Sequence, residues 1–208
     1  MKNLMKQPQA GQPLSQRQVL AGKYHTARMN LLLVVGFTVI NLVLLLANSY
    51  TYFLFSASVP YYLTDLGMYL CGKYPAEFYG ADYAELAFLE PTFLIAMVVI
   101  SFLIVALYFV CWLMSKKHGA GWLIAALVLF AVDTVGMFLW FGISVDMIMD
   151  ILFHAWVIYY LIMGIVVYYK FKKLPEEEEV PVTAFEEEPA LAEGEESDVS
   201  QESDEAGE

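Results

Sequence analysis

Long apolar stretches with almost no charged side chains dominate the first 170 residues. Residues 29–64, 91–115 and 151–169 contain no Lys, Arg, Asp or Glu, and residues 118–145 contain only Asp133. A helix needs about 20 apolar residues to cross a hydrocarbon core about 30 Å thick. Helices are the expected crossing elements because unpaired backbone groups are not tolerated in lipid. The pattern predicts an all-α membrane protein, a four-transmembrane-helix bundle with spans at about 30–55, 92–115, 122–144 and 149–169.

The longest connection between two spans is the segment 57–90, which we call the outer cap. Its apolar residues recur at helical spacing over 59–70, Ser58 is expected to cap this helix, and Pro60 falls in its first turn. A helix of about 12 residues is too short to cross a membrane. We therefore expect it to lie along the interface or to dip into it beside the bundle.

A second short helix is predicted near the end of the outer cap. Asp82 and Glu85 have the spacing of a capping box, just before Pro91, where the second span is expected to begin. Two interpretations of the outer cap are open. It is either a lid or recognition surface for something outside, or a tyrosine-rich interfacial collar that shields the bundle, and we favour the collar.

Composition excludes several classes of protein. Apolar residues make up 59% of the chain, against roughly 45–50% in soluble proteins, and charged residues make up 16%. A soluble fold of this size has too little polar surface to cover so many apolar side chains, which excludes a water-soluble enzyme. Two cysteines and a net charge of −12 exclude a disulfide-stapled fold and a nucleic-acid partner.

The net charge combines a basic membrane body with an acidic tail. Residues 174–208 carry 15 acidic residues and no Lys or Arg, which leaves 8 acids against all 11 bases in residues 1–173. The tail is rich in Glu, Ser, Pro and Gly, a composition typical of disorder. It is either a docking arm for a basic cytoplasmic protein or a solvated tail that follows the last span, and we favour the solvated tail.

The distribution of Lys and Arg predicts the orientation of the chain. With four spans, ten of the eleven bases fall on one side of the membrane, and short loops rich in Lys and Arg mark the cytoplasmic side. We expect both termini in the cytoplasm, with 1–28 as a basic arm and 29–173 as the transmembrane domain of a protein of the cytoplasmic membrane. Lys73 is the one outer base; the other ten are Lys2, Lys6, Arg17, Lys23, Arg28, Lys116, Lys117, Lys170, Lys172 and Lys173.

Polar side chains inside the spans form the candidate site. Asp133 lies near the middle of the third span, where an acid costs about 2.5–3.5 kcal/mol. Such residues face inward and find partners. A rise of 1.5 Å per residue places Asn41 and His154 at matching depth, with Asn48 further outward in the first span.

A stripe of titratable residues is also predicted on the fourth span. Asp146, Asp150 and His154 are spaced i, i+4 and i+8, so they line one face of a helix from the outer surface inward. Together with the acid of the third span they predict a polar track that opens to the outside.

Three interpretations of these groups compete. In the first, Asp133, Asp150 and His154 relay protons or hold a cation, since a carboxylate–imidazole pair exchanges protons near neutral pH. In the second, the same residues bind a catalytic metal, which needs three or more convergent ligands. In the third, Asp133, Asn41 and His154 are interhelical hydrogen-bond fixtures, each bond worth about 0.6 kcal/mol. Asp146 and Asp150 then sit in the first turn of the fourth span, where the helix dipole favours acidic side chains. We favour this third interpretation.

Two segments resemble small four-pass membrane proteins of Gram-positive bacteria. They are Phe55–Tyr62 (FSASVPYY), followed by Leu66-Gly-Met68, and Asp150–Tyr160 (DILFHAWVIYY). The resemblance covers the membrane body more than the tail; it implies residence in the cytoplasmic membrane and implies no mechanism. Nucleotide loops and the H-E-x-x-H, G-x-S-x-G and C-x-x-C motifs do not occur in the sequence, so we predict no catalytic residue, cofactor or metal.

The leading functional prediction is a non-enzymatic accessory or interaction protein of the membrane. The alternative is a small proton- or cation-coupled transporter or ion conductor that uses Asp133, Asp150 and His154. The partners expected are the lipid bilayer, a basic cytoplasmic protein that binds the acidic tail, and further copies of the chain.

Overall fold

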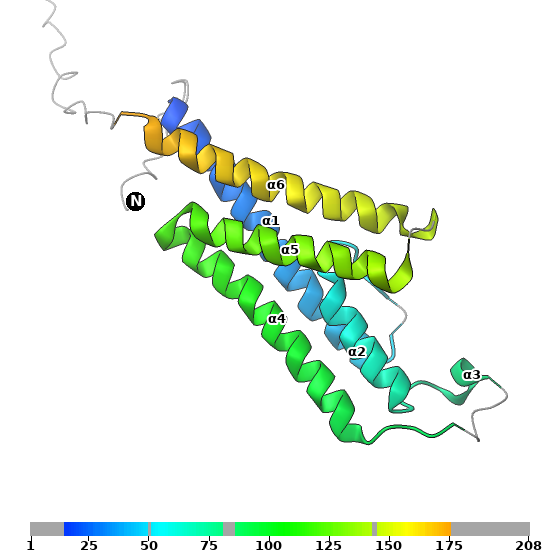
Figure 1. Ribbon diagram of the computed structural model, residues 1–208. Helices are drawn as coiled ribbons and strands as arrows, with labels where there is room; N and C mark the ends of the chain where they lie inside the picture. Colours follow the sequence, from blue (N-terminus) through cyan, green and yellow to red (C-terminus); the bar gives the residue numbers. More distant parts are fainter. Residues whose placement is uncertain (1–14, 50, 81–85, 143–144, 176–208) are drawn as a thin grey trace, which may run out of the picture. The chain divides into compact units, whose positions relative to one another are not determined.

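The computed structural model describes residues 15–49, 51–80, 86–142 and 145–175. The chain divides into two units, Met1–Leu174 and Pro175–Glu208, and every described helix belongs to the first. All regular structure in these ranges is helical, and α1, α4, α5 and α6 are long and apolar enough to cross a membrane. The helices are α1 (Gln16–Leu46), α2 (Ser58–Leu70), α3 (Ala76–Tyr79), α4 (Pro91–His118), α5 (Ala120–Phe141) and α6 (Ile148–Lys173), the last preceded by the 3-10 turn η2 (Val145–Met147) (Figure 1).

The first long helix corrects the predicted span at both ends. Instead of covering 30–55, α1 begins within the predicted basic arm and ends at Leu46. At its start Ser15 and Gln18 form a capping box: the Gln18 N–H donates to Ser15 Oγ at 3.2 Å, and the Ser15 N–H donates to Gln18 Oε1 at 3.1 Å. At its end the chain turns at Asn48, whose φ of 54° is left-handed.

After α1 the chain turns back along the bundle. Residues 51–57 form no helix and run beside α1, where Asn41 Nδ2 donates to the Phe53 carbonyl at 2.7 Å and Asn41 Oδ1 accepts the Phe53 N–H at 2.8 Å. Thr38 Oγ1 accepts the Ala57 N–H at 2.8 Å. Non-helical backbone inside an apolar bundle is tolerated where protein groups pair with it, and these side chains provide that pairing.

The short helix α2 then runs away from the middle of the bundle towards α3 (Figure 1). We call residues 51–70 the re-entrant hairpin. α2 packs against α1, α4 and α5, and its position relative to the membrane interface stays a prediction. The expected second helix around Asp82 and Glu85 falls on residues 81–85, outside the described ranges.

Glycines allow α2 to lie close to the long helices. A Cβ added to Gly136 of α5 would come within 2.6 Å of Val59 Cγ2. A Cβ added to Gly67 of α2 would lie 3.1 Å from the side chains of Leu94 and Met97 in α4. The missing side chains thus make room for the re-entrant hairpin on two sides.

The other spans begin and end near their predicted limits. Pro91 occupies the first turn of α4, as expected for a residue without an N–H. Gly119, with a left-handed φ of 77°, forms the turn that joins α4 and α5. These two helices therefore form an antiparallel hairpin with a very short turn.

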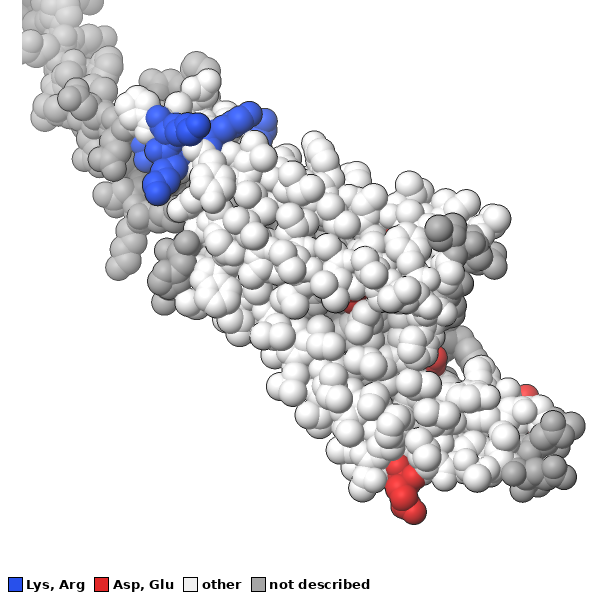
Figure 2. Space-filling view, viewed as in Figure 1, with Lys and Arg blue, Asp and Glu red and all other residues white. Residues whose placement is uncertain are grey.

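Charged side chains are separated along the bundle. The N-terminal end of α1 lies beside the C-terminal end of α6, since Arg17 packs over the Phe171 ring at 4.6 Å and the Tyr24 and Tyr168 rings are 5.7 Å apart. Lys and Arg side chains gather at this end of the face shown in Figure 2, which we call the basic end, and acidic side chains lie towards the other. The described bases at the basic end are Arg17, Lys23, Arg28, Lys116, Lys170, Lys172 and Lys173.

We predict that Gly164→Ala lowers the melting temperature of the purified protein. An added Cβ would meet Ala27 Cβ at 2.6 Å and Leu123 Cδ1 at 3.2 Å, and overpacking of this kind costs about 1–3 kcal/mol. Gly36→Ala is the matched control, because nothing lies within 4 Å of its added Cβ. Equal melting temperatures for the two variants would contradict the close approach of α1 and α6.

Candidate functional site

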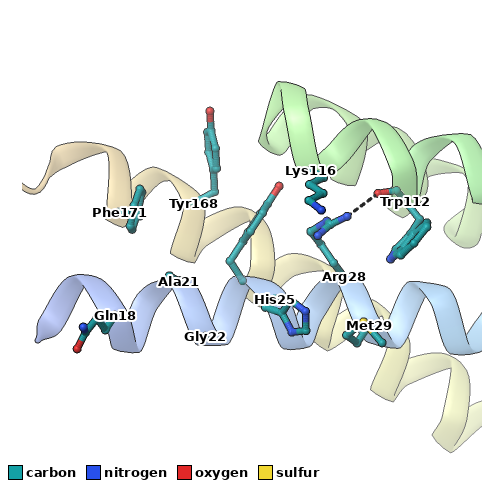
Figure 3. A pocket seen from close by; sticks show the side chains of 11 residues that line it. Gln18, Ala21, Gly22, His25, Arg28, Met29, Trp112, Lys116, Tyr168 and Phe171 are labelled. Carbon is teal, nitrogen blue, oxygen red and sulfur yellow. Dashed lines mark hydrogen bonds between the residues drawn. The ribbon is translucent and has the colours of Figure 1, made fainter. Parts of the chain in front are cut away.

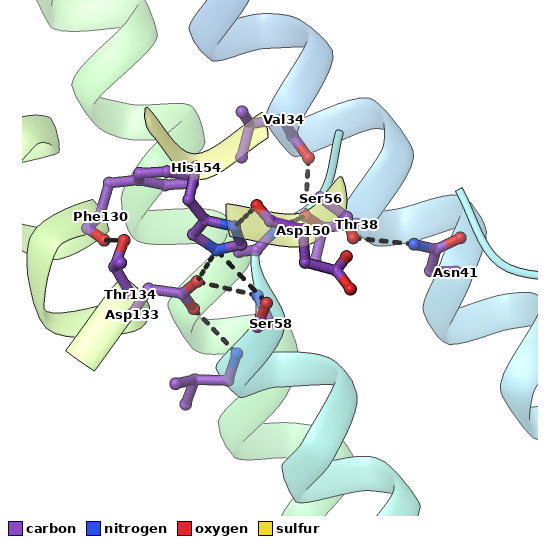
Figure 4. Close-up of polar contacts among 12 residues, drawn as sticks. Val34, Thr38, Asn41, Ser56, Ser58, Phe130, Asp133, Thr134, Asp150 and His154 are labelled. Atoms are coloured by element: carbon purple, nitrogen blue, oxygen red, sulfur yellow. Dashed lines mark hydrogen bonds and ion pairs between the residues drawn. The ribbon is translucent and has the colours of Figure 1, made fainter. Parts of the chain in front are cut away.

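Asp133 lies within α5 and caps the start of α2. Its side chain is 3% exposed. Oδ2 accepts the Ser58 N–H at 2.8 Å and Oδ1 accepts the Val59 N–H at 2.9 Å (Figure 4). The first amides of a helix have no partner within that helix, and the helix dipole favours a negative charge beside them. An acid of one helix therefore supplies the N-terminal cap of another.

This arrangement corrects the predicted role of Ser58. Ser58 is the first residue of α2 rather than its cap, and the cap position belongs to Ala57, which has no side-chain hydrogen bond to offer. The first backbone amides of α2 therefore donate to a group that is distant in sequence, the carboxylate of Asp133.

His154 of α6 contacts the same carboxylate. Its Nε2 lies 3.3 Å from Asp133 Oδ2 and 3.3 Å from Ser58 Oγ, and its Nδ1 lies 2.9 Å from the Asp150 carbonyl oxygen. The Phe130 ring stacks on the imidazole with centroids 4.9 Å apart. The imidazole is 2% exposed and is held between α2, α5 and its own helix.

The hydrogen-bond pattern fixes the tautomer of His154. A carbonyl oxygen only accepts, so His154 Nδ1 carries the hydrogen of its bond to Asp150. Nε2 is then the ring nitrogen that faces Asp133 Oδ2 and Ser58 Oγ. The site therefore holds a carboxylate, an imidazole and a hydroxyl in one buried hydrogen-bonded cluster.

Ser58, His154 and Asp133 are the residue types of a hydrolase triad, but their arrangement differs. In a triad the serine and the acid bind opposite nitrogens of the imidazole. Here both contact Nε2, and Nδ1 is occupied by a backbone carbonyl. This geometry does not orient an imidazole as the general base of a serine nucleophile.

The structure separates Asn41 and Asn48 from the pair. Asn41 is fully buried, yet its side chain bonds to the hairpin at Phe53 and, from Nδ2 at 2.8 Å, to Ser56 Oγ. Asn48 is exposed at the turn, where Nδ2 lies 3.4 Å from the Lys73 carbonyl. The expectation that Asn41 partners Asp133 is wrong, because the extended segment lies against it instead.

The predicted stripe on the fourth span is present in part. Asp150 and His154 lie one turn apart on α6, but the link between them is the Asp150 backbone carbonyl. In the described residues the Asp150 carboxylate has one buried oxygen, Oδ1, without a hydrogen-bond partner. The backbone of Asp146 lies in η2, and its side chain is outside the described part of the chain.

Sequence reasoning missed the small hydroxyl residues of the site. Thr38 donates to the Val34 carbonyl at 2.6 Å while accepting from Ala57, and Ser56 accepts from Asn41. The available signal was a set of hydroxyl residues within an otherwise apolar stretch. For a metal, the described residues offer no cluster of three or more His, Cys, Asp or Glu side chains.

No protein-family model, curated protein or solved structure matches this chain. The resemblance to small four-pass membrane proteins of Gram-positive bacteria stays a prediction. The fold and site define a class in physical terms: an all-helical protein with four helices able to cross a membrane and a re-entrant hairpin capped by a buried acid. Its function has to be inferred from that geometry.

We predict that Asp133→Ala destabilises the bundle by about 3–5 kcal/mol, the usual cost of removing one partner of a buried pair. Reversible unfolding in mixed micelles measures this change. Hydrogen exchange at the Ser58 and Val59 amides is expected to accelerate more than exchange elsewhere in α2. Val132→Ala is the control, since its side chain is 65% exposed. Unchanged protection of the two amides in Asp133→Ala would disprove the capping role.

Proposed function

We propose that this chain is a multi-pass protein of the cytoplasmic membrane, with both termini in the cytoplasm, that works as a non-enzymatic accessory or interaction protein. The observation that carries the proposal is the use of Asp133: each carboxylate oxygen accepts a backbone amide of α2. A transport or catalytic acid needs an oxygen available to its substrate. The acid of this bundle holds the re-entrant hairpin instead.

The distribution of charge supports the proposed orientation. Seven described bases lie at the basic end (Figure 2), and basic residues are enriched on the cytoplasmic side of membrane proteins. In this orientation the outer cap faces the exterior and the acidic tail lies in the cytoplasm.

In the outer cap, residues 71–80 and 86–90 are anchored to the outer end of α2. The Leu89 N–H donates to the Leu70 carbonyl at 2.8 Å, and Tyr79 Oη donates to the Tyr69 carbonyl at 3.0 Å. Tyr74 Oη donates to the Asp65 carboxylate. Burial, followed by this hydrogen bond, raises the pKa of the Tyr74 hydroxyl above its ordinary value, so the hydroxyl stays protonated and keeps donating. The re-entrant hairpin thus holds the tyrosine-rich outer cap in position as an interfacial collar.

Of the two interpretations of the acidic tail, the docking arm predicts that cross-linking in cells followed by purification recovers a basic cytoplasmic partner with the full chain and not with a chain lacking residues 174–208. A tail of equal length with Gln and Asn in place of its acids is the control, and it is also expected to fail. In a parallel pull-down without cross-linker, salt should release the partner, because the screening length falls from about 10 Å at 0.1 M to about 3 Å at 1 M. Recovery of the same proteins with all three chains would contradict a role for the tail. If no chain recovers any partner, the interaction proposal fails.

A second candidate is a proton or cation conductor. One specific observation favours it: His154 Nε2 lies 3.3 Å from Asp133 Oδ2, and Asp150, one turn along α6, has a buried oxygen without a partner among the described residues. One turn of a helix is about 5.4 Å. A proton that left His154 through Nδ1 would therefore meet a second acid close by.

Proteoliposomes with an internal pH dye separate the two candidates. For a structural cluster we expect the wild-type protein to leave an imposed pH gradient intact and Asp133→Asn to lower the melting temperature. For a conductor, the wild-type protein collapses the gradient, and Asp133→Asn and His154→Gln abolish that flux while melting normally. Asp65→Asn is the control, because it removes an acid outside the cluster.

A further inference from the structure

A groove lies at the basic end of the bundle, between α1, α4 and α6. It has a volume of about 560 Å³. Figure 3 shows Arg28 reaching from α1 to the C-terminal part of α4, where Trp112 and Lys116 lie, with Tyr168 and Phe171 of α6 along the other side. None of these residues belongs to the Asp133 cluster.

Arg28 is a buried cation without a counter-charge in the described structure. Its side chain is 7% exposed. Nε donates to Ser115 Oγ at 2.7 Å and Nη2 donates to the Trp112 carbonyl at 3.0 Å, which uses two of the five guanidinium hydrogens. Among the described residues no carboxylate lies within ion-pair distance of Arg28. A buried charge that lacks an opposite charge is strongly unfavourable, so this position favours an anion.

Two further donors line the same groove. Trp112 Nε1 is buried and has no hydrogen-bond partner in the described residues, although buried polar groups almost always have one. Lys116 is exposed at the rim and adds a second positive charge. A phosphate group, with several acceptor oxygens, matches this set, because a guanidinium binds phosphate through two parallel N–H bonds.

The remaining walls of the groove are apolar. Ala21 and Met29 of α1 and Phe171 of α6 line it, and the Tyr24 hydroxyl is already bonded to the Ser115 carbonyl at 2.8 Å. A soluble phosphate would leave these surfaces unused, whereas the hydrocarbon of a lipid covers them. The sequence indicates Arg28 only as one of ten bases on one side of the membrane; the structure buries it within a shaped groove.

We infer that this groove binds one anionic phospholipid, with the phosphate against Arg28, Lys116 and Trp112 and the hydrocarbon along the α1 and α6 walls. The site does not depend on the proposed function or on which leaflet the basic end occupies. It requires only that the lipid headgroup carry a net negative charge, since a choline headgroup brings its own cation to a basic end.

Native mass spectrometry of the full chain in detergent tests this site. The probes are phosphatidylglycerol, phosphatidylcholine with the same acyl chains, and soluble glycerol phosphate. We expect one phosphatidylglycerol to bind about tenfold more tightly than phosphatidylcholine, and glycerol phosphate to bind far more weakly than either lipid.

Substitutions assign the contacts. Arg28→Gln is expected to weaken phosphatidylglycerol binding by about tenfold, as for a charge-assisted hydrogen bond, and Lys116→Gln and Trp112→Phe by about fivefold each. Lys172→Gln, which removes a base at the same end outside the groove, is the control and should stay within twofold of the wild-type protein. If Arg28→Gln fails to fold, the Lys116 and Trp112 variants carry the test, because neither removes a buried ion.

Three results would overturn the site. They are equal binding of the two lipids, binding by Lys116→Gln and Trp112→Phe that equals that of Lys172→Gln, and glycerol phosphate binding as tight as the lipid. The last result would assign the groove to a soluble phosphate compound instead.

Discussion

The structure depends on one buried acid that caps a helix other than its own. Asp133 alone would be a costly residue for an apolar helix, and the first amides of α2 alone would be costly at the same depth. Placed together they satisfy each other, and His154 lies against the same carboxylate. Through this contact α2, α5 and α6 meet at one point, while Asn41 and Thr38 tie the rest of the hairpin to α1.

The order of the helices was predictable because charged side chains are rare in apolar spans. The limits of α4, α5 and α6 fell close to the predicted ones for this reason. The limit of α1 did not, because the chain turns at Asn48 and the backbone of Phe53 pairs with the Asn41 side chain instead of continuing the helix. Hydropathy records how apolar a segment is and does not record which groups pair with its backbone. A polar Asn48 and nearby hydroxyl residues were the local signs of a turn.

The sequence predicted at which level of the bundle the site residues lie, but not which helix face carries each side chain. Counting the rise along each helix brought Asp133 and His154 to the same level, and the structure joins them. The same count placed Asn41 there, yet a helix has faces, and the face of Asn41 is covered by the extended part of the hairpin. Arg28 shows the same gap at the basic end: its charge was evident from the sequence, and its burial against Trp112 was not. Both errors come from contacts between segments distant along the chain.

The capping contact also sets an order of events during synthesis. Ser58 and Asp133 are 75 residues apart, a distance the ribosome covers in about 4–15 s at 5–20 residues per second. Through that interval the amides at the start of α2 have no carboxylate to receive them. The short helix is therefore one of the last elements to settle, and a nascent chain released before α5 enters the bilayer would leave the translocon with an unfinished fold that quality-control proteases can recognise.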